Sequence, residues 1–287
     1  MIKCSPFPKA LEIQTASYCN GMCAICPYRD IKDSKSHGVM SKDLFKKIID
    51  QIKNPWGIKI IPYLNNEPFL DPYFIDRLKY INKKCPEAEI EISTNLSMLN
   101  EEMQNKMLGI NIRDLRMSIF GFTEKTHKKA MPGILWKNVK QNLDLLVSNK
   151  KLRNSIGQLS IVMIDYPRIS QKDIEIAKKF CEKNCIKFEL WGFLDRSNNV
   201  KKYKNNIYKK QTAGCQQNRP LDRIHITYSG KVILCCMDWK SDYILGDLNK
   251  QTIQRVWDST KYRKIRKRIY LKNEKSIALC KKCKLAL

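Results

Sequence analysis

Three cysteines near the start of the chain constrain its fold and chemistry more than any other feature of the sequence. Cys19, Cys23 and Cys26 have the spacing C-x3-C-x2-C, and they follow a short apolar run at residues 10–15 that predicts a strand. Three thiolates on one loop can bind three irons of a cubane cluster and leave the fourth iron open. A structural zinc ion is the alternative, but it needs a fourth ligand from a distant part of the chain.

The size and composition of the chain favour a globular cytoplasmic protein. The chain has 287 residues, of which 43% are hydrophobic, so a buried core can form. No apolar run approaches the ~18 residues of a membrane span, and the first residues lack the apolar stretch of a secretory signal. We therefore expect no membrane partner. Disulfides are disfavoured in the cytosol, so the 12 cysteines indicate metal binding or redox chemistry.

The net charge of the chain is +26, because Lys and Arg number 54 whereas Asp and Glu number 28. A basic surface is one feature of proteins that bind nucleic acids. The lysines are spread along the whole chain, however, and the basic clusters at residues 201–210 and 263–268 lack the interleaved aromatic residues on which single strands stack. We therefore favour a solvated, lysine-rich surface over a nucleic-acid interface.

Short apolar runs alternate with amphipathic stretches of helical period over residues 8–193. The runs predict six strands, at residues 10–15, 58–63, 89–93, 114–120, 158–164 and 187–193. Helices are expected between them, at residues 41–52, 71–81, 101–109, 135–146 and 170–183. This alternation indicates a parallel sheet with right-handed crossovers, and we predict a partial (β/α)6 TIM-like barrel of the α/β class. Functional residues are then expected at the carboxyl ends of the strands.

The pattern changes after Arg196. Residues 197–214 are predicted to be a linker, which separates a barrel domain at 1–196 from a small domain at 215–287. The small domain is expected to contain a β-hairpin at residues 223–228 and 231–236, followed by a helix around 252–270. A segment of this size cannot form a large core of its own, so a bound metal would stabilise it.

A second set of cysteines supplies the ligands for such a metal. Cys215, Cys235, Cys280 and Cys283 can close an iron–sulfur cluster completely, and zinc accepts the same four thiolates. Cys236 is not needed for this set, and strand alternation predicts that it faces away from Cys235. Its possible roles are an alternative ligand, a small buried residue or a donor of hydrogen atoms.

The cysteine triplet at the end of the first strand of a β/α barrel resembles that of the radical S-adenosylmethionine (AdoMet) superfamily. Three later motifs match this superfamily in the same order: Leu64-Asn65-Asn66-Glu67-Pro68 resembles G-G-E-P, Ser93-Thr94-Asn95 resembles S-T-N-G, and Ser118-Ile119-Phe120-Gly121 resembles S-I-D-G. The departures are two asparagines in place of both glycines, Leu96 in place of a glycine, and Phe120 in place of an aspartate.

The resemblance implies which residues contact AdoMet. Ile25 stands where the family usually has an aromatic residue beside the adenine, and Tyr28 is our candidate for that role. The other residues that the matching motifs implicate are Asn66, Glu67, Ser93, Asn95 and Ser118. The open iron of the cluster on Cys19, Cys23 and Cys26 would then bind AdoMet itself.

The order Cys…Gly-x4-Cys…Cys-x2-Cys resembles the SPASM/twitch extension of the same superfamily. Five cysteines are fewer than a full SPASM domain carries, so the shorter twitch type with one auxiliary cluster agrees better with the sequence. Residues 191–199 are similar to a segment of twitch enzymes of the 2-deoxy-scyllo-inosamine dehydrogenase type, which implies that Arg196 lies at the substrate. The alternative is a surface arginine paired with Asp195.

The resemblance implies two 4Fe-4S clusters, AdoMet as cofactor, and an external electron donor such as flavodoxin or ferredoxin. The expected activity is reductive cleavage of AdoMet to a 5′-deoxyadenosyl radical that abstracts a hydrogen atom from a polar small molecule or a peptide. We expect a two-electron oxidation of a sugar, cyclitol or similar molecule, with the auxiliary cluster as electron acceptor. The alternatives are an epimerase or peptide maturase that uses Cys236 as hydrogen donor, an RNA-modifying enzyme, and a binding module without activity.

Overall fold

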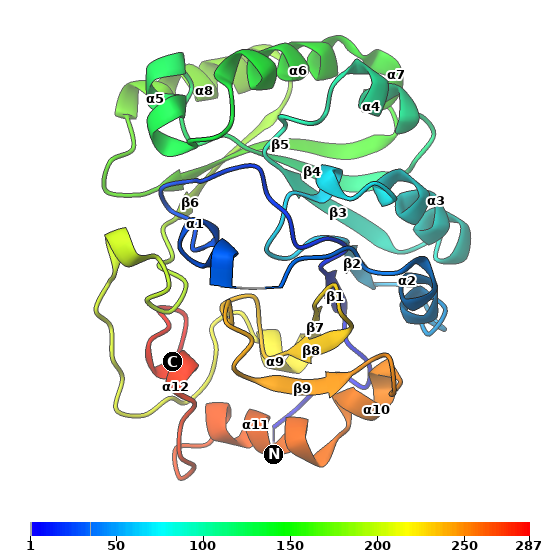
Figure 1. The fold of residues 1–287 in the computed structure, drawn as a ribbon, viewed down its shortest axis with the longest axis vertical. Helices are drawn as coiled ribbons and strands as arrows, with labels where there is room; N and C mark the ends of the chain where they lie inside the picture. The colour runs from blue at the N-terminus through cyan, green and yellow to red at the C-terminus, as the bar shows by residue number, and fades with distance from the viewer. Residues whose placement is uncertain (1, 35) are drawn as a thin grey trace.

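A single nine-stranded sheet organises the computed structural model, which describes residues 2–34 and 36–287 (Figure 1). The strand order is β6-β5-β4-β3-β2-β1-β7-β8-β9. The first six strands are parallel to their neighbours and curve into a partial barrel, as the sequence predicts. They are β1 (Ala10–Ile13), β2 (Lys59–Ile61), β3 (Glu89–Thr94), β4 (Ile112–Ser118), β5 (Ile156–Asp165) and β6 (Lys187–Gly192).

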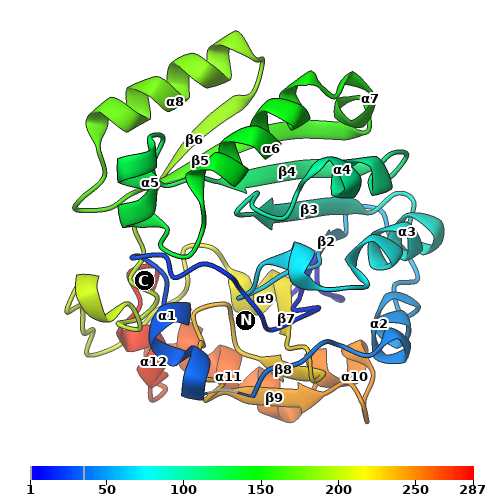
Figure 2. The same ribbon diagram turned by 45° about the horizontal axis from the view of Figure 1, so that its top comes forward.

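Helices cover the outer face of the barrel strands (Figure 2). The five helices that the sequence predicts there are α2 (Lys42–Ile49), α3 (Phe74–Lys84), α4 (Glu101–Lys106), α6 (Trp136–Ser148) and α8 (Gln171–Lys183). Shorter elements lie in the connections: α1 (Tyr28–Ile31), α5 (Glu124–Ala130), α7 (Lys150–Arg153), and the 3-10 turns η1 (Lys32–Ser34), η2 (Pro68–Leu70) and η3 (Lys201–Tyr203). None of the helices in the described residues is both long and apolar enough to span a bilayer.

The start of α3 differs from the sequence prediction, whereas that of α8 agrees with it. Helix α3 begins at Phe74 rather than near Asp71, because the Asp71 carboxylate accepts a hydrogen bond from the backbone of Tyr73 and pairs with Arg77. Helix α8 begins where the sequence predicts, after Ser170, which caps it by accepting a hydrogen bond from Asp173 N; the Asp173 side chain takes no part in this cap. The Asp173 carboxylate instead accepts a hydrogen bond from the backbone of Phe122 at 2.9 Å, which connects α8 to the loop after β4.

The two faces of the barrel strands differ in polarity, because successive side chains of a strand point to opposite sides. Leu11 and Ile13 of β1 belong to the apolar core beneath the helices. The inner face carries charged groups, and Glu91 of β3 is at their centre. Its carboxylate accepts hydrogen bonds from Lys59 Nζ at 3.1 Å and Arg116 Nη1 at 2.6 Å. The barrel therefore has a polar interior.

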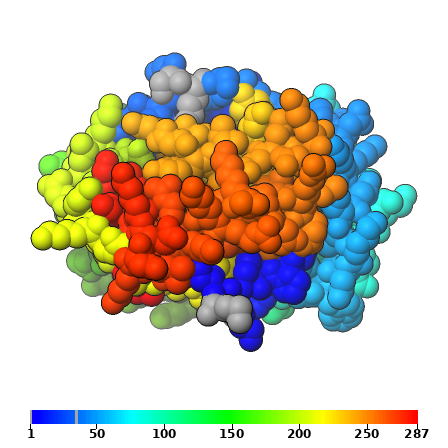
Figure 3. All heavy atoms as spheres, turned by 90° about the horizontal axis from the view of Figure 1, so that it is seen from below, coloured from blue at the N-terminus to red at the C-terminus, as the bar shows by residue number. Residues whose placement is uncertain are grey.

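The C-terminal part of the chain extends the barrel sheet. Strand β7 (Arg223–Ile226) pairs with β1 in parallel, with Glu12 opposite His225, and β8 (Lys231–Ile233) completes the predicted hairpin. A further strand that the sequence did not predict, β9 (Ile244–Asp247), pairs with β8. Figure 3 shows the orange and red C-terminal segments beside the blue N-terminal residues, and the Trp257 indole donates a hydrogen bond to Ser5 O.

The single helix predicted at 252–270 is in fact two helices, α10 (Ile253–Trp257) and α11 (Thr260–Tyr270), because Ser259 caps a new start by accepting from Tyr262 N. Two one-turn helices complete this part, α9 (Arg219–Asp222) and α12 (Ala278–Lys281). Arg266 of α11 does not contribute to the basic surface. Its buried guanidinium donates to the carbonyl oxygens of Pro220 and Trp257.

The buried ion pair between Arg77 and Asp71 supplies a test of this fold. Arg77 Nε lies 2.7 Å from Asp71 Oδ2, and both side chains are almost fully buried. Asp71→Ala leaves the guanidinium charge buried without its counter-ion, so we expect it to lower the free energy of unfolding by about 3–5 kcal/mol in urea titrations. Asp144→Ala, in the exposed pair with Lys140, should cost less than about 1 kcal/mol. Equal losses in the two variants would contradict the interpretation.

Candidate functional site

The loop between β1 and α1 brings Cys19, Cys23 and Cys26 together. The Gly21 backbone N–H contacts Cys19 Sγ at 3.4 Å, and Cys26 N donates to Cys23 O at 3.1 Å. Burial raises the pKa of each thiol, to about 12 for Cys19, and the neighbouring thiols raise that of Cys23 further. A bound metal ion reverses this effect, because its charge stabilises thiolates. Three neighbouring, half-buried thiols therefore suit an iron–sulfur cluster better than a reaction that needs a free thiolate in contact with solvent.

The segment after α5 holds this cysteine loop in place. Met22 N donates to Pro132 O at 2.7 Å, and Ala24 N donates to Ala130 O at 2.9 Å. Gly133 has φ +87, and a Cβ at this position would lie 2.7 Å from Asn20 O. The sequence patterns above did not predict a role for this segment, although Gly133, just after the short helix α5, could have indicated a close approach of two backbone segments.

Tyr28 supports the cysteine loop from the other side. Its hydroxyl accepts a hydrogen bond from Cys19 N at 3.0 Å, and its ring packs with Ile31 and Trp239 against Cys19 and Cys26. The structure therefore places Tyr28 directly beneath the loop, where it fixes the position of the first cysteine.

Glu67 joins the loop after β2 to the end of β3. One carboxylate oxygen accepts from Thr94 Oγ1 at 2.7 Å and Phe69 N at 3.3 Å, and the other accepts from Asn95 N at 2.7 Å. Burial raises the pKa of Glu67 to about 7, although these three donors oppose the rise. In this structure Glu67 thus positions the two loops that carry the motif residues.

The remaining motif residues lie at the carboxyl ends of β2, β3 and β4. The Asn95 amide donates to Asn20 Oδ1 at 2.8 Å, which connects the end of β3 to the cysteine loop. Ser93 and Ser118, on adjacent strands, have their hydroxyl oxygens 3.2 Å apart. Asn66 Nδ2 is buried without a hydrogen-bond partner among the described residues. An acceptor on a bound ligand, such as a carboxylate, would satisfy this donor, so these residues fit AdoMet.

The second set of cysteines converges on one small cavity of about 30 Å³. Its lining includes Cys215, Cys235, Cys280 and Cys283, together with Ser197 and Arg219. Burial raises the pKa of Cys235 well above its ordinary value and that of Cys280 to about 12. Four thiols around one cavity form a donor set that fits a fully ligated cluster.

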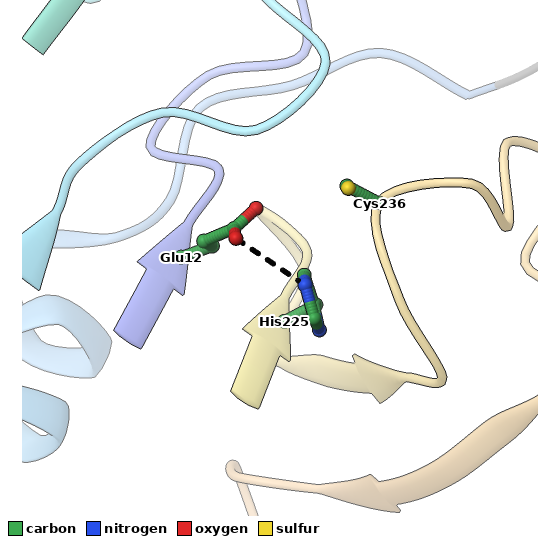
Figure 4. A group of neighbouring side chains, drawn as sticks. All are labelled: Glu12, His225 and Cys236. Atoms are coloured by element: carbon green, nitrogen blue, oxygen red, sulfur yellow. Dashed lines mark ion pairs between the residues drawn. The ribbon is translucent and has the colours of Figure 1, made fainter. Parts of the chain in front are cut away.

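Cys236 is not among the residues that line this cavity. It lies in the loop after β8, because β8 ends at Ile233 and not at residue 236 as the sequence predicts. Figure 4 shows its side chain directed toward Glu12 and His225, whose carboxylate oxygen and ring nitrogen are 3.4 Å apart. Arg219 Nη1 lies 2.8 Å from Cys236 Sγ. Burial alone would raise the pKa of Cys236, but the Arg219 guanidinium holds it below its ordinary value.

The Glu12–His225 pair is buried between β1 and β7. Burial is the largest single effect and alone would raise the pKa of Glu12 and lower that of His225, but the mutual attraction of the pair and the nearby Arg219, Arg223 and Cys236 together outweigh it, so the pKa of Glu12 falls to about 2 and that of His225 rises to about 9. The carboxylate, the ring nitrogen and the Cys236 sulfur lie within 4.8 Å of one another, which is close enough to bind a metal ion. Arg219 already supplies a positive charge there and opposes a cation. Sequence reasoning missed this group because its members are far apart along the chain.

Arg196 lies between the two cysteine sets. Its Nη1 lies 3.8 Å from Met237 Sδ, and its charge opposes the rise that burial causes in the pKa of Cys26. The Asp195 carboxylate accepts from Asn205 N, and in the part of the chain that the structure describes no ion pair joins it to Arg196. Arg196, Ser197 and Asn198 form a left-handed turn, with φ values of 53°, 58° and 65°.

Comparison with family models matches the Radical SAM superfamily over residues 13–181, more than half of the chain. The chain belongs to the radical SAM superfamily. The model of the SPASM iron–sulfur cluster-binding domain matches residues 215–284, which include the second cysteine set. The S-adenosyl-L-methionine-dependent 2-deoxy-scyllo-inosamine dehydrogenase of Niallia circulans is 21% identical over 280 residues, covering 95% of this chain and 91% of that protein.

Three solved structures share the fold of this chain. BtrN in complex with AdoMet and 2-DOIA is 19% identical with a TM-score of 0.62, over 96% of this chain and 92% of that one. Streptococcus suis SuiB bound to precursor peptide SuiA is 16% identical with a TM-score of 0.73, over 98% and 71%. Native anSMEcpe with bound AdoMet is 15% identical with a TM-score of 0.66, over 96% and 86%.

The positions of Cys235 and Cys236 predict different effects of their removal on iron content. Cys235→Ala takes one thiolate from the cavity and should lower the iron content of anaerobically reconstituted protein by about four per chain. Cys236→Ala should leave the iron content unchanged, because its sulfur lies outside the cavity. Iron and sulfide analysis measures both. Loss of iron in the Cys236 variant alone would identify Cys236 as the ligand instead.

Proposed function

We propose that this chain binds one 4Fe-4S cluster through Cys19, Cys23 and Cys26 and an auxiliary cluster through Cys215, Cys235, Cys280 and Cys283, and that it oxidises a polar small molecule such as a sugar or cyclitol. When bound, AdoMet and the first cluster would supply the radical chemistry that removes a hydrogen atom from the substrate, and the auxiliary cluster would supply an acceptor for the second electron. The observation that carries this proposal is the position of Arg196 between the two cysteine sets.

The chain's own residues orient AdoMet and shape its site. Asn66 Nδ2 is the unpartnered donor available for the carboxylate of AdoMet. The Ser93 and Ser118 hydroxyls offer further polar contacts on the adjacent strands. Glu67 and Asn95 fix the loops on which these groups stand, and Tyr28 fixes the cysteine loop.

Arg196 binds the oxygen of the substrate carbon that is oxidised. A guanidinium offers hydrogen-bond donors and no acceptor, so it does not act as a base. Its positive charge instead stabilises the oxyanion that develops as the hydroxyl proton leaves. The hydrogen bonds that Asn199 Nδ2 donates to Arg196 O and Met237 O hold this arginine near the second cysteine set.

The polar interior of the barrel supports a polar substrate. Asp114 Oδ1 and Arg116 Nε are buried beside the Glu91 network and have no hydrogen-bond partner among the described residues. Buried polar atoms are rarely left unpaired. Hydroxyl or amino groups of a substrate would satisfy them, whereas an apolar substrate would not.

Epimerisation is the second candidate, and the position of Cys236 favours it. Cys236 is not among the residues that line the auxiliary cavity, and its side chain is directed toward Glu12 of β1 (Figure 4), so its thiol is not needed as a cluster ligand. An epimerase must return a hydrogen atom to the substrate, which a thiol can supply. Maturation of a peptide precursor would use the same groups.

Anaerobic protein reduced with dithionite should convert AdoMet to 5′-deoxyadenosine and methionine, detected by liquid chromatography. Cys19→Ala should abolish this cleavage because it removes a ligand of the first cluster. Cys185→Gly, at an exposed cysteine with φ +52, is the matched control and should retain it. The absence of 5′-deoxyadenosine from the wild-type protein with full iron content would refute the proposed function.

Arg196→Ala should slow substrate oxidation by about 10²-fold or more, as expected for loss of one oxyanion-stabilising group, and should leave iron content and AdoMet binding intact. The first substrate to assay is 2-deoxy-scyllo-inosamine, with mass spectrometry in D2O. Oxidation yields a product two mass units lighter, whereas epimerisation yields a product with one solvent deuterium. A deuterated product that disappears in Cys236→Ala would favour epimerisation.

A further inference from the structure

A cleft of about 350 Å³ next to the cysteine loop has no role in the mechanism above. It lies between α1 and the turn that joins β7 to β8, at the carboxyl ends of β1, β2 and β7. We call it the basic cleft, and the side chains that characterise its lining are Tyr28, His37, Tyr228, Trp239, Lys32 and Lys240. Figures 1 and 2 show α1 facing the β7–β9 region across this part of the molecule.

Side chains that form one wall of the basic cleft also pack against the cysteine loop. Tyr28, Ile31 and Trp239 line the cleft, and the same three side chains pack against Cys19 and Cys26. Tyr28 contacts the backbone of Cys19 directly through its hydroxyl. A molecule seated in the cleft is therefore separated from two ligands of the proposed first cluster by one layer of mainly aromatic side chains.

The charge of the basic cleft is positive. None of its lining residues in the described part of the chain is acidic, and three of them are lysines. Lys231 is paired with Asp247 at 2.8 Å, but Lys240 makes no ion pair with any described residue, and Lys32 has only the exposed Asp33 at 4.0 Å. Two lysine charges thus remain available to an anionic partner.

An unpartnered polar group also points to a ligand at this cleft. Trp239 is only 6% exposed, and its indole Nε1 has no hydrogen-bond partner among the described residues. A buried N–H of this kind is costly unless an acceptor reaches it.

We propose that the basic cleft is the docking site of an acidic electron-transfer protein that carries a low-potential flavin or iron–sulfur centre. This inference rests on the proposed function, which needs an external donor of one electron. One electron passes from the reduced centre of the donor to the oxidised cluster on Cys19, Cys23 and Cys26, and no bond is formed or broken. Complementary charge on the two proteins accelerates their encounter, and salt weakens it.

The test uses the iron-loaded protein and a bacterial flavodoxin reduced to its hydroquinone. In the double variant Lys32→Glu/Lys240→Glu, the KM for flavodoxin in AdoMet cleavage should rise at least tenfold at low salt. The rate with dithionite should stay within twofold of the wild-type rate, because dithionite does not need the docking site. The control variant Lys137→Glu/Lys151→Glu reverses two exposed lysines on α6 and α7 and should leave both values unchanged.

Direct binding separates failure of this inference from failure of the proposed function. The dissociation constant of flavodoxin for the iron-loaded wild-type protein should be at least tenfold lower than for Lys32→Glu/Lys240→Glu, whether or not AdoMet is cleaved. Equal dissociation constants, or equal KM values in the two double variants, would overturn the docking site. Absence of dithionite-driven cleavage together with a tenfold difference in binding would refute the proposed function alone.

Discussion

Strand β1 forms hydrogen bonds along both edges, to β2 on one side and to β7 on the other, and the position of every candidate group depends on this double pairing. The loop that follows β1 carries the first three cysteines. Pairing with β2 places this loop beside the Glu67 segment, and pairing with β7 places it beside the loop of Cys235 and Cys236. A single central strand thus brings two thiol sets, far apart along the sequence, to one end of the sheet.

Electrostatics explains why both thiol sets suit metal clusters. Without a metal, burial holds the pKa of six of these thiols above its ordinary value, so the apoprotein keeps their protons: Cys19, Cys23, Cys26, Cys235, Cys280 and Cys283. Binding of iron replaces those protons with a positive charge, and burial then strengthens the attraction. Arg196 and Arg219 add fixed positive charges next to the two sets. The same low-dielectric surroundings that disfavour the free thiolates therefore favour the clusters.

Local sequence patterns predicted much of this fold, but they could not predict contacts between residues that are far apart in the sequence. The six barrel strands follow from short apolar runs, and the helices predicted to start near residues 41 and 170 do start there, capped by Ser41 and Ser170. Strand β9 was missed, because four residues with one buried side chain carry little signal. The pairing of β7 with β1, and with it the buried Glu12–His225 pair, depends on residues more than 200 positions apart.

The left-handed turn at Arg196, Ser197 and Asn198 has a consequence for the order in which the protein loosens. Three consecutive residues of this handedness, none of them glycine, cost roughly 1 kcal/mol each. The side-chain oxygen of Asn198 is also buried without a hydrogen-bond partner among the described residues. This turn therefore adds unfavourable free energy to the native state, and local opening of the structure should begin there. Because this turn lies between the two thiol sets, backbone amide exchange and proteolytic cleavage measured at the turn would report whether the structure around both sets is intact.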